Sequence, residues 1–136
     1  MILVDAGPLV ALFDPRDAAH RDCRLRLGSF TEGMATTLPA LTEAFHLLGS
    51  GGREADDLRA FVVSQAVAVH RPSDAEIARA FELMEAYRDQ RMDFADASIV
   101  AAAETLRTRK IFTLDDRDFT VYRIRRGHRL YPPEIV

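Results

Sequence analysis

The chain has 136 residues, enough for one domain with a sizeable core and too few for two, so we expect a single domain over 1–136. Apolar residues make up 48% and charged residues 29% of the sequence, proportions that are typical of a globular protein and exclude a disordered chain. The net charge of −3 gives no overall attraction for nucleic acid. The single cysteine, Cys23, excludes an internal disulfide and a cysteine-ligated metal site, and we interpret it as a structural or surface thiol in a reducing compartment.

The N-terminal part is predicted to alternate short strands with helices. The apolar run at 1–4 (MILV) is interpreted as a buried strand that leads, after Asp5, into a helix with Pro8 in its first turn. Asp5 and Pro8 interrupt the apolar residues of the N-terminus, and no basic residue precedes them. We therefore expect neither a signal peptide nor a membrane span, and we expect the protein to be cytoplasmic. Helical spacing over 17–27 ends at a glycine, and MATT at 34–37 is the second predicted strand.

The middle of the chain continues this alternation. After Pro39, helical spacing runs to Gly49, where a glycine-rich loop leads into a predicted helix over 54–64. AVAVH at 66–70 is the third predicted strand. The next helix is expected to begin at Ser73, because a serine followed three residues later by glutamate is a capping box.

The last third of the chain completes the pattern with a predicted helix over 94–108 and a strand over 110–115 (KIFTLD). RLY at 129–131 is a further candidate strand. Short strands that alternate with helices indicate an α/β fold with a mainly parallel central sheet flanked by helices. Sheets of this kind bind ligands at the carboxyl ends of their strands, so we expect the functional site there.

Acidic residues occur where burial is expected. Asp5 and Asp115 end two predicted strands, and Glu43 lies among the apolar residues of PALTEAFHLL. In RMDFADASIV, Asp93 and Asp96 are three residues apart and share one face of a helix. Burying ionised carboxylates is costly and clustering them raises their pKa values, whereas a divalent cation removes both problems. Carboxylate oxygens suit Mg²⁺ or Mn²⁺ and not Zn²⁺.

Each acid also has a purely structural interpretation. Asp5 and Asp93 are good helix N-caps, and Glu43 is suited to an ion pair with an arginine. The aspartates of TLDDRDF at 113–119 are common in turns. Asp96 is the hardest to explain in this way, because it follows the cap and precedes a buried alanine-rich face. The hypothesis of a metal site therefore depends on all of these acids converging on one edge of the sheet.

Basic residues concentrate at the other end of the chain. Residues 1–100 hold 10 basic and 16 acidic side chains, whereas residues 101–136 hold 8 basic and 5 acidic ones. The segment VYRIRRGHRLY contains four arginines and no acid: Arg123, Arg125, Arg126 and Arg129. Guanidinium groups fork onto phosphate oxygens, which favours phosphate recognition, although a GC-rich coding sequence also enriches arginine. The alternative is that they pair with the acidic first hundred residues.

Four motifs, taken together, resemble those of a PIN domain, and within that family those of the VapC toxins of bacterial toxin–antitoxin (VapBC) pairs. The motifs are ILVDAGPLVALFD, LPALTEAFHLL, MDFADASIVAAA and IFTLDDRDF. The resemblance covers essentially the whole chain and implies a three-layer fold. It assigns the family's acidic quartet to Asp5, Glu43, Asp96 and Asp115. Asp93 matches an additional acid, Thr113 a hydroxyl beside the last acid, and Asp118-Phe119 the DF pair.

The resemblance further implies Mg²⁺- or Mn²⁺-dependent cleavage of RNA, a homodimer, and a small antitoxin protein as partner. We expect Asp5 and Asp96 to hold the catalytic ion, with Glu43, Asp93 and Asp115 completing the cluster, recruiting a second ion or orienting the attacking water. If the last strand ends one residue later, Asp116 replaces Asp115. The four arginines are then candidate contacts to the RNA backbone.

The sequence is also compatible with other functions. The chain could be a non-toxin PIN-domain nuclease in RNA processing, or a PIN-like module that binds RNA or protein without cutting. The complete acidic set argues against the second, because degenerate members lose acids. A receiver-type phosphoryl-transfer protein would need a lysine after a late strand, whereas the only lysine, Lys110, precedes it.

Overall fold

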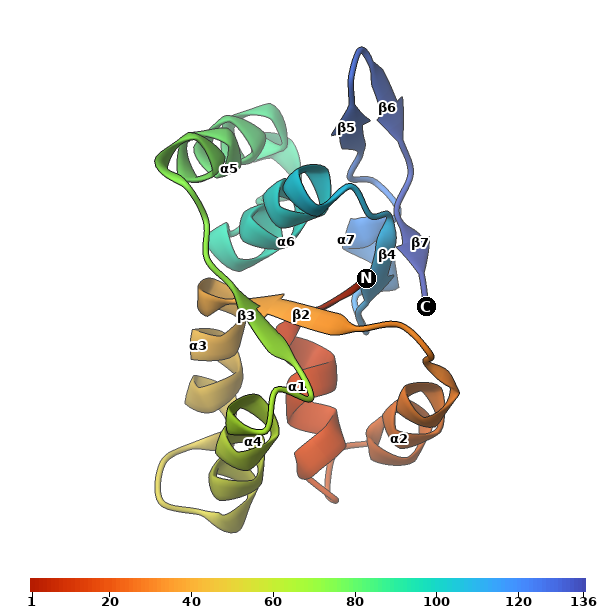
Figure 1. The fold of residues 1–136 in the computed structure, drawn as a ribbon. Helices are drawn as coiled ribbons and strands as arrows, with labels where there is room; N and C mark the ends of the chain where they lie inside the picture. Colours follow the sequence, from red (N-terminus) through yellow and green to blue (C-terminus); the bar gives the residue numbers. More distant parts are fainter.

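The computed structural model describes all 136 residues and is built on a five-stranded sheet with the strand order β3-β2-β1-β4-β7 (Figure 1). Every neighbouring pair in it is parallel, which confirms the predicted sheet. The strands are β1 (Ile2–Val4), β2 (Met34–Thr37), β3 (Ala68–His70), β4 (Lys110–Phe112) and β7 (Glu134–Ile135). A separate antiparallel hairpin is formed by β5 (Ile124–Arg126) and β6 (Arg129–Tyr131). RLY is therefore a strand, but it lies outside the main sheet.

Helices cover both faces of the sheet and complete the three expected layers (Figure 1). They are α1 (Ala6–Phe13), α2 (His20–Ser29), α3 (Leu38–Leu48), α4 (Arg53–Val63), α5 (Asp74–Ala86), the short η1 (Arg88–Gln90), α6 (Phe94–Leu106) and α7 (Asp116–Phe119). None of them is both long and apolar enough to span a membrane.

Successive side chains of β1 point to opposite faces of the sheet, so they belong to two separate hydrophobic clusters. Leu3 packs with α5 and α6 in one cluster, whereas Ile2 and Val4 pack with α1, α2 and α4 in the other. The alanine-rich run of α6 is buried throughout from Ala97 to Ala103, as the sequence predicted. Cys23 lies in the second cluster and is buried, and burial raises the pKa of its thiol to about 11.

Several predicted boundaries were wrong. The helix expected over 17–27 begins at His20 and continues through Gly28 to Ser29, because residues 14–19 form turns. Ser73 does cap α5 by accepting from the Glu76 N–H, but the Glu76 carboxylate contacts His70 and does not reciprocate. The strand expected over 110–115 ends at Phe112, so Asp115 lies after the strand and caps α7, a helix that was not predicted.

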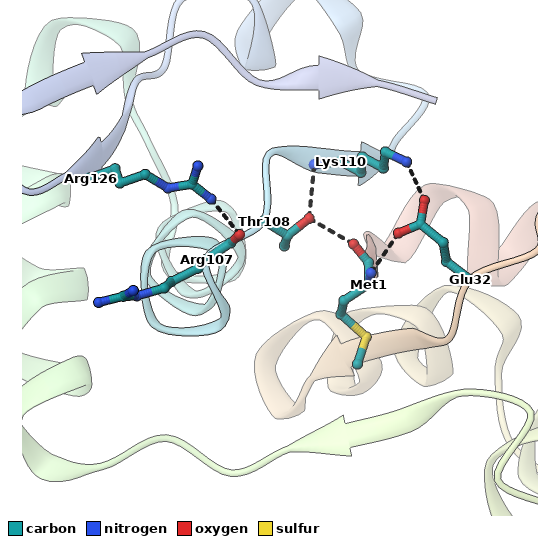
Figure 2. A network of polar contacts seen from close by, with 6 residues as sticks. All are labelled: Met1, Glu32, Arg107, Thr108, Lys110 and Arg126. Carbon is teal, nitrogen blue, oxygen red and sulfur yellow. Dashed lines mark hydrogen bonds and ion pairs between the residues drawn. The ribbon is translucent and has the colours of Figure 1, made fainter.

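The amino edge of the sheet is held by a network of paired polar groups (Figure 2). The N-terminal ammonium of Met1 donates to Glu32 at 2.6 Å, and Lys110 pairs with the same carboxylate. The Thr108 hydroxyl donates to the Met1 carbonyl at 2.7 Å. These contacts join the starts of β1 and β4 to the loop before β2, and so fix the edge opposite the one where the site is expected.

Candidate active site

A cavity of about 380 Å³ opens at the carboxyl edge of the sheet, where α1, α6 and α7 begin and α3 passes. Six carboxylates line it, and we call it the acidic crevice: Asp5, Glu43, Asp93, Asp96, Asp115 and Asp118. The first five are the residues expected from the sequence, and the structure brings all of them to one cavity. Asp118 was not among them.

Asp5 follows β1 and is buried, with 7% of its surface exposed. One oxygen accepts from the Ala6 N–H at 2.8 Å, which caps α1, and the other accepts from the Thr113 hydroxyl at 2.9 Å. Thr113 also accepts from the Asp115 N–H at 3.0 Å and therefore connects two acids of the crevice. Burial raises the pKa of Asp5 despite these hydrogen bonds, which favour the ionised form.

Two more of the acids are helix caps as well as crevice residues. Asp93 accepts from the Asp96 N–H at 2.8 Å and begins α6, and Asp115 accepts from the Asp118 N–H at 3.2 Å and begins α7. The structural and the functional interpretations of these acids are thus compatible. A helix N-terminus favours a negative charge, so the three caps help to hold carboxylates together at one place.

Asp96 lies in the first turn of α6 without being its cap. Its pKa is raised to about 7, first by burial and then by the charges of Asp93, Asp5 and Asp115. The Tyr122 hydroxyl donates to Asp96 at 2.9 Å and partly offsets this rise. Tyr122 is fully buried, and burial raises its own pKa as well. Sequence reasoning missed this tyrosine, because nothing in a lone Tyr within VYRIRRG signals a contact to a residue 26 positions earlier.

The most compact group consists of Asp96, Asp115 and Asp118, whose carboxylate oxygens lie within 4.8 Å of one another. Burial and the neighbouring Asp115 carboxyl raise the pKa of Asp118. The signal for Asp118 was its spacing of three from Asp115, which becomes meaningful only once α7 is known to be helical. Asp116 lines a different cavity, so the alternative in which it replaces Asp115 is not the arrangement found.

Glu43 reaches the crevice from α3. It takes part in no ion pair, so the predicted alternative of an arginine partner is not what the structure contains. Burial, followed by the charges of Asp93 and Asp5, raises its pKa. Glu43 is therefore a carboxylate that faces the crevice without a cationic partner.

The donor set fits a small divalent cation. All six candidate ligands are carboxylates, the hard oxygen donors that Mg²⁺ and Mn²⁺ prefer, and two oxygens on opposite sides of a Mg²⁺ ion lie about 4 Å apart. The Asp96, Asp115 and Asp118 oxygens lie within 4.8 Å of one another, a separation that one small ion can span. The raised pKa values of Asp5, Glu43 and Asp96 are offset by no cationic side chain of the protein, and that of Asp118 is offset only in part by Arg117. The donor chemistry of the site therefore fits a divalent cation, whose charge would favour the ionised form of these carboxylates.

The C-terminal arginines lie away from this cavity. Arg123 donates to the Thr120 and Tyr122 carbonyls, and Arg126 to the Arg107 carbonyl. Arg125 and Arg129 are exposed on the β5–β6 hairpin. None of the four forms an ion pair, so the predicted pairing with the acidic part of the chain is wrong for this structure.

Fold and site together define an α/β domain whose parallel sheet carries a carboxylate cluster at its carboxyl edge. The chain belongs to the PIN domain family, whose model matches residues 2–125. Among curated proteins it is similar to Ribonuclease VapC26 of Mycobacterium tuberculosis, with 29% identity over 126 residues that span 90% of this chain and 92% of that protein.

Two solved structures share the fold. The crystal structure of Mycobacterium tuberculosis VapC20, a sarcin–ricin loop cleaving toxin, superposes with a TM-score of 0.79 at 24% identity, covering 85% of this chain and 91% of that one. A chain of a toxin–antitoxin complex from Klebsiella pneumoniae gives a TM-score of 0.67 at 20% identity, covering 89% and 92%. They confirm the α/β fold expected from the sequence.

Proposed function

We propose that this chain is a Mg²⁺- or Mn²⁺-dependent endoribonuclease that acts in the cytoplasm as the toxin of a toxin–antitoxin pair. The observation that carries the proposal is the convergence of six carboxylates, none of them in an ion pair, on one crevice at the carboxyl edge of the sheet. Membership of the PIN domain family and similarity to a ribonuclease support the same reaction.

The residues that would hold the cation are Asp96, Asp115 and Asp118, with Asp5 and Asp93 beside them. When bound, a divalent cation polarises a phosphate oxygen and lowers the pKa of a coordinated water. Asp5 is kept in place by Thr113 and the start of α1, and Asp96 by Tyr122. Asp5, Glu43, Asp96 and Asp115 form the proposed catalytic set.

Glu43 is the proposed residue that orients the attacking water and accepts its proton. Its carboxylate has no hydrogen-bond partner in the chain, and its raised pKa makes it a better base than an ordinary glutamate. The water oxygen bonds to phosphorus while the bond to the 3′ oxygen breaks, and the leaving oxygen takes a proton from solvent, which leaves a 5′-phosphate and a 3′-hydroxyl. The RNA 2′-hydroxyl takes no part, so we expect a weaker activity on DNA.

The hairpin arginines are proposed as secondary contacts to the RNA backbone. Arg125 lies beside Glu104, because its N–H donates to that carboxylate at 2.9 Å. Eight residues of α6 separate Glu104 from Asp96, which is about 12 Å along the helix. Arg125, Arg126 and Arg129 would therefore bind phosphates remote from the one that is cut.

The reaction is tested with labelled single-stranded RNA and the purified chain in Mg²⁺ or Mn²⁺. We expect endonucleolytic products with 5′-phosphate ends, and none in EDTA. Transfer, ribosomal and messenger RNA assayed separately would identify the target class. Undiminished cleavage in EDTA would refute the metal mechanism, and RNA binding without any cleavage would favour the non-catalytic module.

The toxin role is tested in cells. Expression of the chain alone should arrest growth, and co-expression of a small protein encoded immediately upstream should relieve the arrest and co-purify with the chain. We also expect a homodimer by light scattering. Harmless expression of a protein with measurable activity would instead favour a nuclease of RNA processing.

A further inference from the structure

Arg91 is the single basic residue that lines the acidic crevice. It is exposed and lies between η1 and α6, two residues before the cap Asp93. Six carboxylates share the cavity with it, yet its guanidinium takes part in no ion pair. Arg79, by contrast, is held by Glu104 through two hydrogen bonds of 2.8 and 3.0 Å. Arg91 therefore faces the crevice with its donors free.

The backbone holds Arg91 in a fixed position. The residue has φ 53° and ψ 42°, a left-handed conformation that costs free energy for any residue with a side chain. Its N–H donates to the Arg88 carbonyl at 3.0 Å, and that of the next residue, Met92, donates to the Tyr87 carbonyl at 3.4 Å. Met92 is buried in the core, and Asp93 is fixed as the cap of α6. The side chain at position 91 is thus presented from a segment that is anchored on both sides.

We propose that Arg91 binds a backbone phosphate of the RNA at the mouth of the acidic crevice, and so determines which phosphodiester reaches the carboxylates. The inference rests on the proposed ribonuclease function. A planar guanidinium presents two parallel N–H donors to a phosphate, a geometry that lysine does not offer. In a cavity of carboxylates that repel RNA, a free arginine is the protein group that attracts it.

Arg107 provides a matched control. It has almost the same backbone conformation, φ 54° and ψ 42°, is exposed, and takes part in no ion pair. It lies at the opposite end of α6, and its side chain extends away from the neighbouring polar network (Figure 2). Glycine at either position removes one positive charge and relieves the same backbone strain. Arg91→Gly and Arg107→Gly therefore make the same change of charge and of backbone freedom, one in the crevice and one at the far end of α6.

The test measures RNA binding by fluorescence anisotropy in Mg²⁺, with a fluorescein-labelled single-stranded RNA of about 20 nucleotides. Both glycine substitutions are made in a chain that also carries Asp96→Asn, so that the RNA is not cut. Arg91→Gly should weaken binding about tenfold at 100 mM salt and reduce the slope of log K against log salt by about 0.7, the value for one phosphate contact on a single strand. Arg107→Gly should leave the affinity within about twofold. Arg91→Lys should restore the slope and only part of the affinity.

Equal affinities and slopes for the two glycine variants would overturn the assignment, as would an absence of RNA binding by the Asp96→Asn chain. A lower thermal midpoint for Arg91→Gly alone, with RNA affinity unchanged, would show a structural role and would also overturn it. The outcome is separable from that of the proposed function. If the wild-type chain failed to cut RNA in Mg²⁺ or Mn²⁺ but RNA binding still depended on Arg91, the ribonuclease proposal would fail and the phosphate contact would stand.

Discussion

The two edges of the parallel sheet carry charge in opposite ways. At the amino edge, the carboxylate of Glu32 meets both the Met1 ammonium and Lys110, so each of these three charged groups has a partner of opposite sign (Figure 2). At the carboxyl edge, six carboxylates share one cavity with a single arginine that pairs with none of them. The same helix, α6, connects the edges, with Asp93 and Asp96 at its start and Arg107 at its end.

The two edges therefore differ in how their carboxylates are balanced: Glu32 has cationic partners within the chain, and the carboxylates of the acidic crevice are in no ion pair. The amino pairs lower the pKa of Glu32 to about 2, so its ionised form is favoured in the folded state. Burial and like charges raise the pKa of Asp96 to about 7, so its ionised form is disfavoured there. Carboxylates whose pKa values are raised by burial and by one another are typical of functional sites, and the donor chemistry of this cluster fits a divalent cation.

The largest expected effect comes from Asp96→Asn. We expect RNA cleavage to be lost, because a proposed ligand of the cation is removed, while the metal-free protein becomes more stable at pH 8 by about 1–2 kcal/mol after allowance for solvent screening. The folded-state pKa of Asp96 lies above its unfolded value, so wild-type stability falls as pH rises from about 4 to about 7. Thermal unfolding at pH 5 and pH 8 measures this, and the gain should shrink at pH 5. A lower thermal midpoint for the variant than for the wild type at pH 8 would contradict the claim that ionised Asp96 destabilises the metal-free fold.

The second largest effect is expected from a substitution on α7, where Asp118 and Asp116 should differ in their contribution to Mn²⁺ binding and cleavage. Asp118→Asn should weaken Mn²⁺ binding and cleavage by about 10- to 100-fold, because its oxygen belongs to the compact group with Asp96 and Asp115. Asp116→Asn is the matched control, since this exposed residue lines a different cavity and should leave both unchanged. Calorimetric titration with Mn²⁺ and a cleavage assay measure the difference. Equal losses in the two variants would mean that α7 acts through its net charge and not through a specific ligand.

A smaller effect is expected from Tyr122→Phe. The lost hydroxyl donates to the ionised form of Asp96, so its removal should raise the pKa of that carboxyl further and shift the acidic limb of the cleavage profile upward by up to about one pH unit. Cleavage above this limb should be nearly unchanged, because phenylalanine keeps the packing against Tyr87 and Phe119. Superimposable pH profiles would show that the hydrogen bond does not position Asp96.

The smallest effect is expected at the amino edge. Glu32→Gln should lower the thermal midpoint by at most a few degrees at pH 7 and leave cleavage unaltered, because exposed ion pairs contribute little. The folded-state pKa of Glu32 is about 2, so this contribution is present above about pH 4.5 and is lost as pH falls toward 2. Its pH dependence thus has the opposite sign to that of Asp96. Unfolding curves of both proteins between pH 2 and pH 7, with cleavage assayed at pH 7, provide the test.

By itself, the sequence determined the alternation of strands and helices, the position of the buried helix α6, and the five acids that approach one edge of the sheet. These features depend on local spacing and on the rule that parallel strands end at the same edge, so they can be predicted without coordinates. It also indicated correctly that Asp5 and Asp93 are helix caps, because capping is a contact between residues close in sequence.

Only the tertiary structure decided which side chains complete the site. α7 has four residues, too few for helical periodicity to appear in the sequence, so Asp118 could not be distinguished from Asp116. The Tyr122 hydrogen bond, the pKa of Asp96 and the unpaired state of Arg91 depend on burial and on charges from four separate segments, which come together only when the chain folds. Sequence patterns record local geometry, whereas the chemistry of this crevice arises from long-range proximity.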